Sequence, residues 1–207
     1  SRGLGDVYKR QLIVGASGHG KVVADIAELN GYDSILFFDD NETLKKCGKH
    51  TVVGYSSDID RYEGDIIVAI GNAEIRSRIQ DSVASRNFPT LIHPSAVISP
   101  SAQIGSGTVV MANAVINADA VVGKGCIINT CASVDHDCVI GDYVHISVGA
   151  HIAGTVDIGN KTWIGIGATV SNNVSICGGC IIGAGAVVIR DVNESGTYVG
   201  VPIRKIK

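Results

Sequence analysis

The chain has few aromatic residues, few prolines and no cluster of basic residues. Phe, Trp and Tyr account for 5% of its 207 residues while hydrophobic residues account for 45%, so we expect a core of Ile and Val in short strands. A formal net charge of −3 without a run of Lys or Arg excludes the basic surface of a nucleic-acid-binding protein. The apolar stretches fall short of the roughly 20 residues that cross a bilayer, and no signal peptide is visible. Small molecules are therefore the expected partners.

A hexapeptide repeat runs without interruption from about residue 94 to residue 190. Every sixth residue from Ile98 to Val188 is Ile or Val, a periodicity typical of a stacked solenoid. The residue two places earlier is small or β-branched, and the residue after each Ile or Val is often Gly or Asn, which favours a bend there. Three bends would close a triangular coil of eighteen residues. The repeat therefore predicts a parallel β-helix in which residues eighteen apart are vertical neighbours.

Disulfide and metal signatures are missing. Of the six cysteines, Cys126, Cys138 and Cys180 fall on one repeat position where a small apolar residue is wanted, so we interpret them as core thiols in a reducing cytoplasm. Cys177 and Cys180 form one CxxC, but no second pair has the spacing of a zinc site. We expect no metal.

The segment before the repeat alternates strands and helices. Residues 12–14, 35–38 and 65–69 read as strands, a helical pattern follows the first of them, and residues 72–85 form a second helix with Ile75, Ile79 and Val83 on one face. The alternation predicts a Rossmann-like α/β half-domain over residues 12–92, with the β-helix and a C-terminal extension over residues 93–207. Residues 1–11 carry no periodic pattern and are expected to be a tail or a cloning remnant.

A glycine-rich loop at residues 15–20 follows the first strand and opens the first helix. Backbone N–H groups at this position, around Gly18, His19 and Gly20, favour a phosphate, although a tight turn without a ligand is the alternative. Asp39 and Asp40 end the next strand, where an acid meets a ribose or a base in nucleotide-binding folds. Since nothing downstream supplies a second mononucleotide half, a nucleotide sugar fits better than a dinucleotide.

The best catalytic candidate within the repeat is His136, which is followed by Asp137 near a coil corner. A surface His beside an Asp is usually only a solvated pair. Gly154, however, lies eighteen residues further on, one coil above His136, where its N–H could face an oxyanion beside a base. His145 and His151 each precede an inward Ile, so both side chains should point outward, from different faces, either lining a groove or lying on plain surface.

Several motifs together resemble the nucleotide-sugar N-acetyltransferases of the PglD type, and the sialic acid O-acetyltransferases of the NeuD type share the layout. Besides the aspartate pair, the motifs read SGHGK at residues 17–21, AIGN at 69–72, LIHPSA at 91–96, NT at 129–130, HDCVIG at 136–141 and VGVP at 199–202. The resemblance covers the chain from about residue 12 to residue 206. It implies a left-handed β-helix of the hexapeptide acyltransferase superfamily, acetyl-CoA as co-substrate, and a homotrimer with active sites between subunits.

The resemblance also implies roles for individual residues. His136 would be the general base and Asp137 the acid that tunes it, although the PglD-type motif commonly carries Glu there. Gly154 would hold the oxyanion, and His145, Ile166 and Gly200 would lie along the acetyl-CoA channel. The substrate-binding set would be Gly18, His19, Gly20, Asp39, Asp40 and Asn72.

We therefore expect a cytoplasmic enzyme that transfers acetyl from acetyl-CoA directly to the 4-amine of a nucleotide-linked sugar, with UDP as the expected nucleotide. A covalent intermediate is not expected, because Cys138 falls on an inward position. One alternative is O-acetylation of a sialic acid by the same base. A metal-dependent hydratase of the carbonic-anhydrase type is another, although positions 136, 145 and 151 do not suggest one converging site. A non-catalytic scaffold should carry regular Thr ladders, which are absent.

Overall fold

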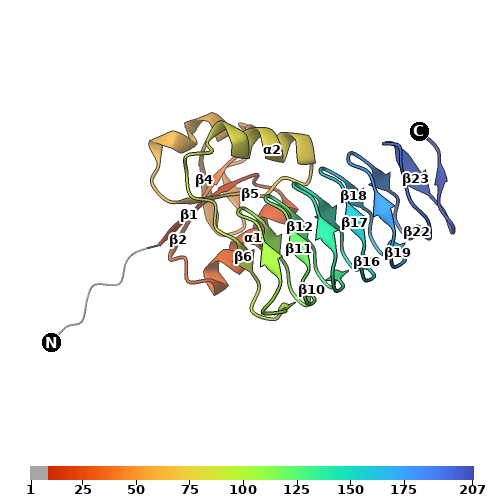
Figure 1. The fold of residues 1–207 in the computed structure, drawn as a ribbon. Helices are drawn as coiled ribbons and strands as arrows, with labels where there is room; N and C mark the ends of the chain where they lie inside the picture. The colour runs from red at the N-terminus through yellow and green to blue at the C-terminus, as the bar shows by residue number, and fades with distance from the viewer. Residues whose placement is uncertain (1–8) are drawn as a thin grey trace.

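The computed structural model describes residues 9–207, which form an α/β domain followed by a triangular solenoid (Figure 1). Most of the expected tail, residues 1–8, lies outside the described residues. Strand β1 (Arg10–Val14) begins two residues earlier than the sequence predicts, because Arg10 and Gln11 pair in parallel with neighbouring strands and Gln11 is fully buried. Arg10 and Gln11 therefore belong to the sheet and not to a tail.

The α/β domain is built on a five-stranded sheet in the order β3-β4-β2-β1-β5. Its strands after β1 are β2 (Ser34–Phe38), β3 (Lys46–Cys47), β4 (His50–Gly54) and β5 (Asp65–Val68). Its helices are α1 (Gly18–Leu29), the 3₁₀ helix η1 (Ser56–Arg61) and α2 (Ala73–Ser82). Strand β1 pairs in parallel with β2 and β5, so the carboxyl ends of these three strands meet at one edge, as expected of a half-domain that binds a nucleotide there.

The solenoid consists of two-residue strands that recur every six residues and stack into three faces. They are β6 (Leu91–Ile92), β7 (Val97–Ile98), β8 (Gln103–Ile104), β9 (Val109–Val110), β10 (Val115–Ile116), β11 (Val121–Val122), β12 (Ile127–Ile128), β13 (Ser133–Val134), β14 (Val139–Ile140), β15 (His145–Ile146), β16 (His151–Ile152), β17 (Asp157–Ile158), β18 (Trp163–Ile164), β19 (Thr169–Val170), β20 (Ser175–Ile176), β21 (Ile181–Ile182) and β22 (Val187–Val188). The eight-stranded face runs from β6 to β24, the six-stranded face from β7 to β22 and the five-stranded face from β8 to β20.

The chain passes from the eight-stranded to the six-stranded to the five-stranded face, and each change of face makes a corner. We call the corner after the eight-stranded face corner 1 (for example residues 129–132), the next corner 2 (residues 135–138) and the third corner 3 (residues 141–144). At the C-terminus β23 (Thr197–Val199) continues the eight-stranded face, and β24 (Arg204–Lys205) pairs antiparallel with it. The predicted combination of α/β half-domain and parallel β-helix is confirmed.

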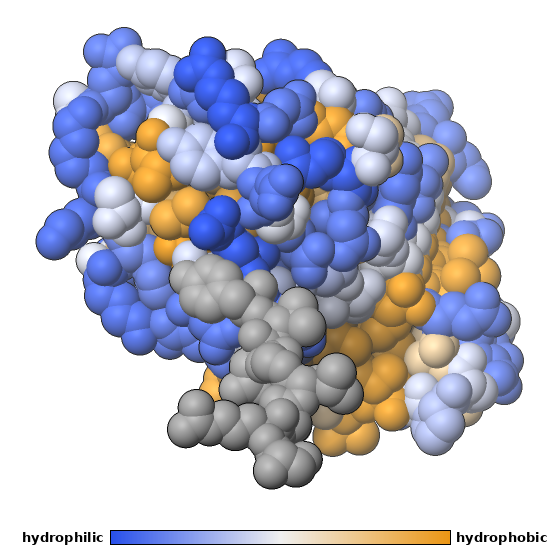
Figure 2. Space-filling view, turned by 90° about the vertical axis from the view of Figure 1, so that its left-hand side faces the viewer, coloured by the Kyte–Doolittle hydropathy of each residue, from blue (hydrophilic) through white to orange (hydrophobic). Residues whose placement is uncertain are grey.

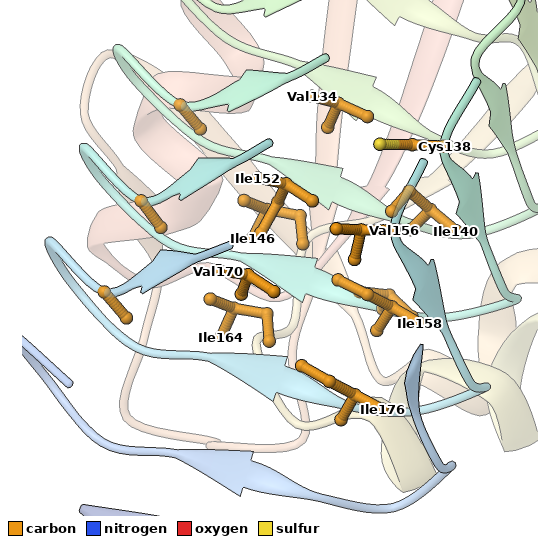
Figure 3. Packing of buried hydrophobic residues seen from close by; sticks show 14 of the residues in the cluster. Val134, Cys138, Ile140, Ile146, Ile152, Val156, Ile158, Ile164, Val170 and Ile176 are labelled. Atoms are coloured by element: carbon orange, nitrogen blue, oxygen red, sulfur yellow. The ribbon is translucent and has the colours of Figure 1, made fainter. Parts of the chain in front are cut away.

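The predicted Ile and Val columns fill the solenoid interior (Figure 3). From Val110 to Val188 every sixth residue is at most 2% exposed. The cysteines at the small inward position, Cys126, Cys138 and Cys180, are at most 1% exposed, as the repeat predicts. Because each column stacks directly on the coil below, the core depends on side-chain volume at every level.

The turn geometry differs from the sequence prediction. Left-handed φ angles occur at the third residue after each inward Ile or Val from Ile104 to Ile182, as at Asp137 (φ 57°), and not at the first. Where the first position holds glycine, the next coil lies too close for a side chain. A Cβ on Gly159, for example, would lie 2.3 Å from the backbone N of Gly178 in the next coil. Glycine at that position permits close stacking of coils, and the bend itself is made two residues later.

Two neighbouring residues of β14 allow the core to be tested. Ile140 is 1% exposed and Val139 is 49% exposed. We expect Ile140→Val to lower the free energy of unfolding by about 0.5–1.5 kcal/mol, because it removes one buried methyl group. Val139→Ala should change it by less than about 0.5 kcal/mol. Denaturant unfolding measures both, and equal losses would show that the inward column does not dominate stability.

Helix α2 packs on the sheet with one side and on the solenoid with another, and the sequence predicts only the first of these contacts. Ile79 and Val83 pack on the sheet as expected, but the helix ends at Ser82 and Ile75 is 37% exposed. The residues of α2 that are most buried are polar: Arg76, Ser77 and Gln80. Arg76 and Gln80 face the solenoid, because both donate hydrogen bonds to its backbone.

The surface is mixed. Seen from the end where the α/β domain lies, hydrophilic residues cover most of that domain and a contiguous apolar area is exposed beneath it (Figure 2). Within residues 9–207, neither helix has the length and apolar character needed to cross a bilayer.

Candidate active site

His136 and Asp137 form a hydrogen-bonded pair at corner 2. Nδ1 of His136 lies 2.7 Å from Oδ2 of Asp137, and both side chains are 58% exposed. Asp137 is the left-handed residue of its turn, a conformation that Asp tolerates better than most residues. The hydrogen bond with Asp137 is the main reason why the pKa of His136 rises above its usual 6.5. Since Nδ1 is occupied, Nε2 is the ring nitrogen available to a substrate.

A second carboxylate, missed by the sequence analysis, holds the backbone of this turn. The N–H of His136 donates to Oδ1 of Asp135 at 2.8 Å, and Nδ2 of Asn117, one coil below, donates to the same oxygen at 2.7 Å. Asn117 and Asp135 are eighteen residues apart, so the repeat period could have paired them. Asp135 also contributes to the raised pKa of His136.

Gly154 lies directly beside the imidazole, as the eighteen-residue period predicts. A Cβ added at Gly154 would lie 2.5 Å from Nε2 of His136 and 2.6 Å from Cε1. The absence of a side chain at Gly154 therefore makes room for the imidazole itself. The N–H of Gly154 has no hydrogen-bond acceptor within residues 9–207. A ring nitrogen and a backbone N–H without an acceptor thus belong to adjoining residues of two successive coils, and attack on a carbonyl uses groups of these two kinds.

The glycine-rich loop combines packing glycines with an open helix terminus. A Cβ on Gly20 would lie 2.2 Å from the carbonyl oxygen of Gly15, whereas a Cβ on Gly18 would meet nothing within 4 Å. Helix α1 has no side-chain cap and no acidic residue in its first turn. Its first N–H groups, on Gly18, His19 and Gly20, have no acceptor in the part of the chain that the structure describes. Such a terminus favours an anion.

Asp39 and Asp40 line a cavity of about 580 Å³ beside this loop, together with Gly15, Ser17 and residues 69–71. The carboxylate of Asp39 accepts from the N–H of Ala16 at 2.7 Å and that of Asn41 at 2.9 Å, so it mainly fixes the loop. Oδ1 of Asp40 accepts from the N–H and hydroxyl of Ser56, which leaves Oδ2 for a ligand.

Asn72 is not among the residues that line this cavity. Its side chain caps α2, with Oδ1 accepting from the N–H of Ile75 at 3.0 Å. The structure therefore gives Asn72 a local structural role, which is a common use of Asn at a helix N-terminus.

His145 does not lie on plain surface, which was one of the two alternatives that the sequence left open. Its ring stacks on Trp163 at a centroid distance of 5.4 Å, and His19 of helix α1 lies 6.5 Å away. Burial lowers the pKa of His145 to about 3 and that of His19 to about 4, so both are neutral at physiological pH. Asn129 lies 3.1 Å from Nε2 of His145. The sequence could not choose between the alternatives, because docking of the α/β domain covers this part of the eight-stranded face.

The remaining candidates are scattered. Ile166 is 62% exposed at corner 1, and the carbonyl of Gly200 accepts from the N–H of Val187 at the last coil. His151 lies on the six-stranded face with Nδ1 2.9 Å from the hydroxyl of Ser133. In the described part of the chain, no three His, Cys, Asp or Glu side chains gather as they would around a metal ion.

Known proteins match both parts of the chain. Residues 11–83 match the family described as the PglD N-terminal domain. The acetyltransferase domain of PglB from Neisseria gonorrhoeae, solved with acetyl coenzyme A, is 41% identical, with a TM-score of 0.92 over 96% of this chain and 100% of that chain. This chain belongs to the PglD-type sugar acetyltransferase family.

Two further relatives extend the range of the family. PerB from Caulobacter crescentus, solved with CoA and GDP-perosamine, is 34% identical to this chain and has a TM-score of 0.90. The match covers 98% of this chain and 99% of PerB. The UDP-N-acetylbacillosamine N-acetyltransferase of Bacillus subtilis is 38% identical over 112 residues, which are 50% of this chain. The PglD-type chain is matched over 52% of the length of that curated relative.

The candidate residues of this chain fall into two groups that lie apart from each other in the structure. His136, Asp137 and Gly154 lie at corner 2, between the six-stranded and five-stranded faces. The glycine-rich loop packs near His145 on the eight-stranded face, and Ile166 lies at corner 1. A full six-stranded face separates corner 1 from corner 2. His136 and the glycine-rich loop of the same chain therefore lie on different sides of the solenoid.

The raised pKa of His136 predicts a specific pH dependence for the PglD-type chain. If His136 is the general base it must be unprotonated to act, so kcat/KM should fall as the pH drops through the pKa of His136, which lies above 6.5. Asp137→Asn removes the hydrogen bond to a carboxylate and lowers that pKa, so the acid limb should move to lower pH. Rates from about pH 5 to pH 9 measure the shift. An unmoved acid limb would assign it to another group.

Proposed function

We propose that this protein N-acetylates the 4-amino group of a UDP-linked amino sugar, with acetyl-CoA as the acetyl donor. The observation that carries the proposal is the His136–Asp137 pair beneath the bare backbone of Gly154. Names of relatives support the substrate class, because one is a UDP-N-acetylbacillosamine N-acetyltransferase and another was solved with GDP-perosamine and CoA.

The chemistry proposed is direct transfer. The sugar nitrogen attacks the thioester carbonyl, Nε2 of His136 takes the amine proton, and the N–H of Gly154 stabilises the oxyanion. Collapse of the tetrahedral intermediate breaks the C–S bond, and the proton passes to the departing CoA thiolate. Asp137 stabilises the imidazolium that forms in between. Cys138 is fully buried and burial raises the pKa of its thiol, so it is unsuited to act as a nucleophile.

The binding sites proposed follow the two groups of residues. The diphosphate would lie on the N–H groups of Gly18, His19 and Gly20, and the nucleoside in the cavity beside Asp40. Acetyl-CoA would run along the solenoid past Ile166 toward Gly200 at the last coil. Neutral His145, covered by Trp163, would line the junction between the two sites.

We further propose that the complete site forms between copies of the chain, in a homotrimer. The reason is that corner 2 and the glycine-rich loop stand on different sides of one solenoid. Exposed apolar side chains on the outer faces support association, namely Val121 (38% exposed), Val139 (49%), Trp163 (44%) and Ile181 (46%).

A shared site predicts complementation between two inactive variants. His136→Ala removes the base, and Gly18→Asp places a carboxylate where the phosphate would bind, in a position where a side chain meets no atom within 4 Å. Co-expressed chains that assemble at random should recover about a quarter of the wild-type activity, because each site needs one intact half from each of two copies. Activity that stays absent in the mixed oligomers, or a stable and active monomer in sedimentation, would place the whole site in one chain.

The activity itself is tested by thiol release from acetyl-CoA with a panel of UDP-4-amino sugars, GDP-4-amino sugars and sialic acids. Turnover of a UDP-4-amino sugar with formation of an amide supports the proposal. Turnover of GDP-linked sugars alone would change the nucleotide, and activity on sialic acid alone would replace N-acetylation by O-acetylation.

A further inference from the structure

Arg76 is a fully buried cation that the proposed chemistry does not use. It lies in α2, is 1% exposed, and has no carboxylate among its hydrogen-bond partners within residues 9–207. Burial lowers its pKa only to about 10, so it remains charged at neutral pH. A buried charge is costly unless its hydrogen bonds are complete. The hydrogen bonds of Arg76 must therefore offset the cost of burying its charge.

Backbone carbonyls from two separate parts of the molecule accept these hydrogen bonds. Nη1 donates to the carbonyls of Ile70 at 2.7 Å and Gly71 at 3.0 Å. Nε donates to Gly125 at 2.6 Å and Nη2 to Tyr143 at 2.7 Å. Ile70 and Gly71 belong to the α/β domain, and Gly125 and Tyr143 are residues eighteen apart at corner 3 of the solenoid. One guanidinium therefore joins the domain to two successive coils.

Each end of this connection leads to residues of the candidate site. Ile70 and Gly71 form part of the wall of the cavity that also contains Asp39 and Asp40. Tyr143 lies two residues before β15, whose first residue, His145, lies beside His19 of the glycine-rich loop. Movement at Arg76 would therefore change where the nucleotide cavity stands relative to the solenoid.

The other side-chain contacts between α2 and the solenoid are longer or involve a more exposed partner, including the bond of 3.0 Å that the Tyr143 hydroxyl donates to Oδ1 of Asp81. Lys161 meets Glu74 at 2.7 Å and Lys124 meets Asp81 at 3.2 Å, and in each pair one side chain is more than half exposed. Surface ion pairs of this kind contribute little to rigidity. Gln80 donates to the carbonyl of Ser106 at 3.4 Å, a long bond. Arg76 thus provides the shortest buried connection.

We propose that Arg76 is a positioning residue that fixes the nucleotide cavity relative to the solenoid, so that a bound nucleotide delivers the sugar amine to the acetyl-transfer site. The inference rests on the proposed function. It deepens that function, because the cavity belongs to the α/β domain and His136, of the same copy or of a neighbouring one, belongs to a solenoid, so the domain junction enters the spacing between them. A misplacement of about 1 Å is enough to lower a rate by about 100-fold.

The planar guanidinium suits this role better than an ammonium. Arg presents donors in a rigid fork, here aimed at four carbonyl oxygens on two domains. Lys carries a single nitrogen and cannot span both sides. Arg76→Lys should therefore behave like Arg76→Met in the assay below, even though it keeps the charge.

The test compares two substrates in the full chain. For the nucleotide-linked sugar that the wild type turns over, we expect Arg76→Met and Arg76→Lys to lower kcat/KM by about 100-fold. For the corresponding amino-sugar 1-phosphate, which lacks the nucleoside anchor, the change should stay within about threefold, and calorimetry with UDP should give a dissociation constant within about threefold of wild type. Equal losses on both substrates, or no loss on either, would overturn the proposal.

Arg86 provides a matched control. It also donates to carbonyls, of Tyr62 at 2.7 Å and Gly64 at 3.2 Å, but both belong to the α/β domain. Arg86→Met should lower the melting temperature without changing the ratio of kcat/KM for the two substrates. The same ratio change in Arg86→Met would mean that general loosening, and not the junction, causes the effect.

Hydrogen exchange reads the junction independently of turnover. Arg76→Met should speed amide exchange at residues 143–145 and in the segment around residues 70–72, and leave the distant coil at residues 169–176 unchanged. Exchange that is unchanged near the junction would overturn the positioning role whatever the enzyme acts on. If the wild type turns over none of the amino sugars, the proposed function fails while exchange still decides whether Arg76 fixes the two domains.

Discussion

His136→Ala should lower kcat/KM for the nucleotide-linked amino sugar by about 10²- to 10⁴-fold, the contribution that a positioned general base makes. The side chain is 58% exposed and packs into no core, so its loss should leave the melting temperature unchanged. Its Nε2 is free while Nδ1 is held by Asp137 at 2.7 Å, which gives one nitrogen the task of accepting the amine proton. Steady-state thiol release from acetyl-CoA measures the effect.

His151→Ala is the control for this substitution. His151 is also exposed and also bonded through Nδ1, to the hydroxyl of Ser133, but it lies on the six-stranded face and not beside Gly154. Its removal should change kcat/KM by less than about twofold. Turnover that survives the loss of His136, or that disappears equally with His151, would remove His136 from the mechanism.

Gly154→Ala should abolish activity nearly as completely as loss of the base, by about 10²-fold or more, without unfolding the solenoid. The new Cβ would lie 2.5 Å from Nε2 of His136, so the imidazole must leave its position. Gly154 does not need a left-handed φ, which means that the substitution introduces crowding alone. The measurement is kcat/KM together with the melting temperature.

Gly179→Ala separates this effect from ordinary coil strain. Gly179 has a φ of 71° at corner 3, away from His136, and a Cβ there would come only within 3.9 Å of another side chain. We expect a loss of stability of about 1 kcal/mol and normal turnover. A Gly154→Ala protein with wild-type kcat/KM would contradict the roles proposed for His136 and for its close contact with Gly154.

The hexapeptide period explains why so much of the solenoid and of corner 2 could be predicted. A period of eighteen residues converts sequence distance into a vertical contact, so Gly154 could be placed beside His136, and Cys126 and Cys138 in the core, without any other information. The same rule would have paired Asn117 with Asp135, had it been applied to polar residues. It could not distinguish the two turn positions, because glycine serves a close approach of backbones at one and a left-handed φ at the other.

Prediction was weaker wherever the two domains meet. His145 alternates correctly with an inward Ile, yet it is covered by Trp163 and by helix α1. The apolar residues of α2 pack on the sheet as predicted. Another side of the helix buries Arg76, because carbonyl groups at corner 3 of the solenoid accept its hydrogen bonds. A period shows which way a side chain points, and only the docked partner determines whether that direction is water or protein.

By itself, then, the sequence determined the triangular coil, its Ile and Val interior, and the local constellation of His136, Asp137 and Gly154, since each depends on spacing within one repeating segment. The tertiary structure decided which polar groups remain available. It committed the Asp39 carboxylate to the loop, neutralised and covered His145, and placed the charge of Arg76 between the domains. The physical reason is that burial and hydrogen-bond partners arise from contacts between segments far apart in the chain, which no local pattern encodes.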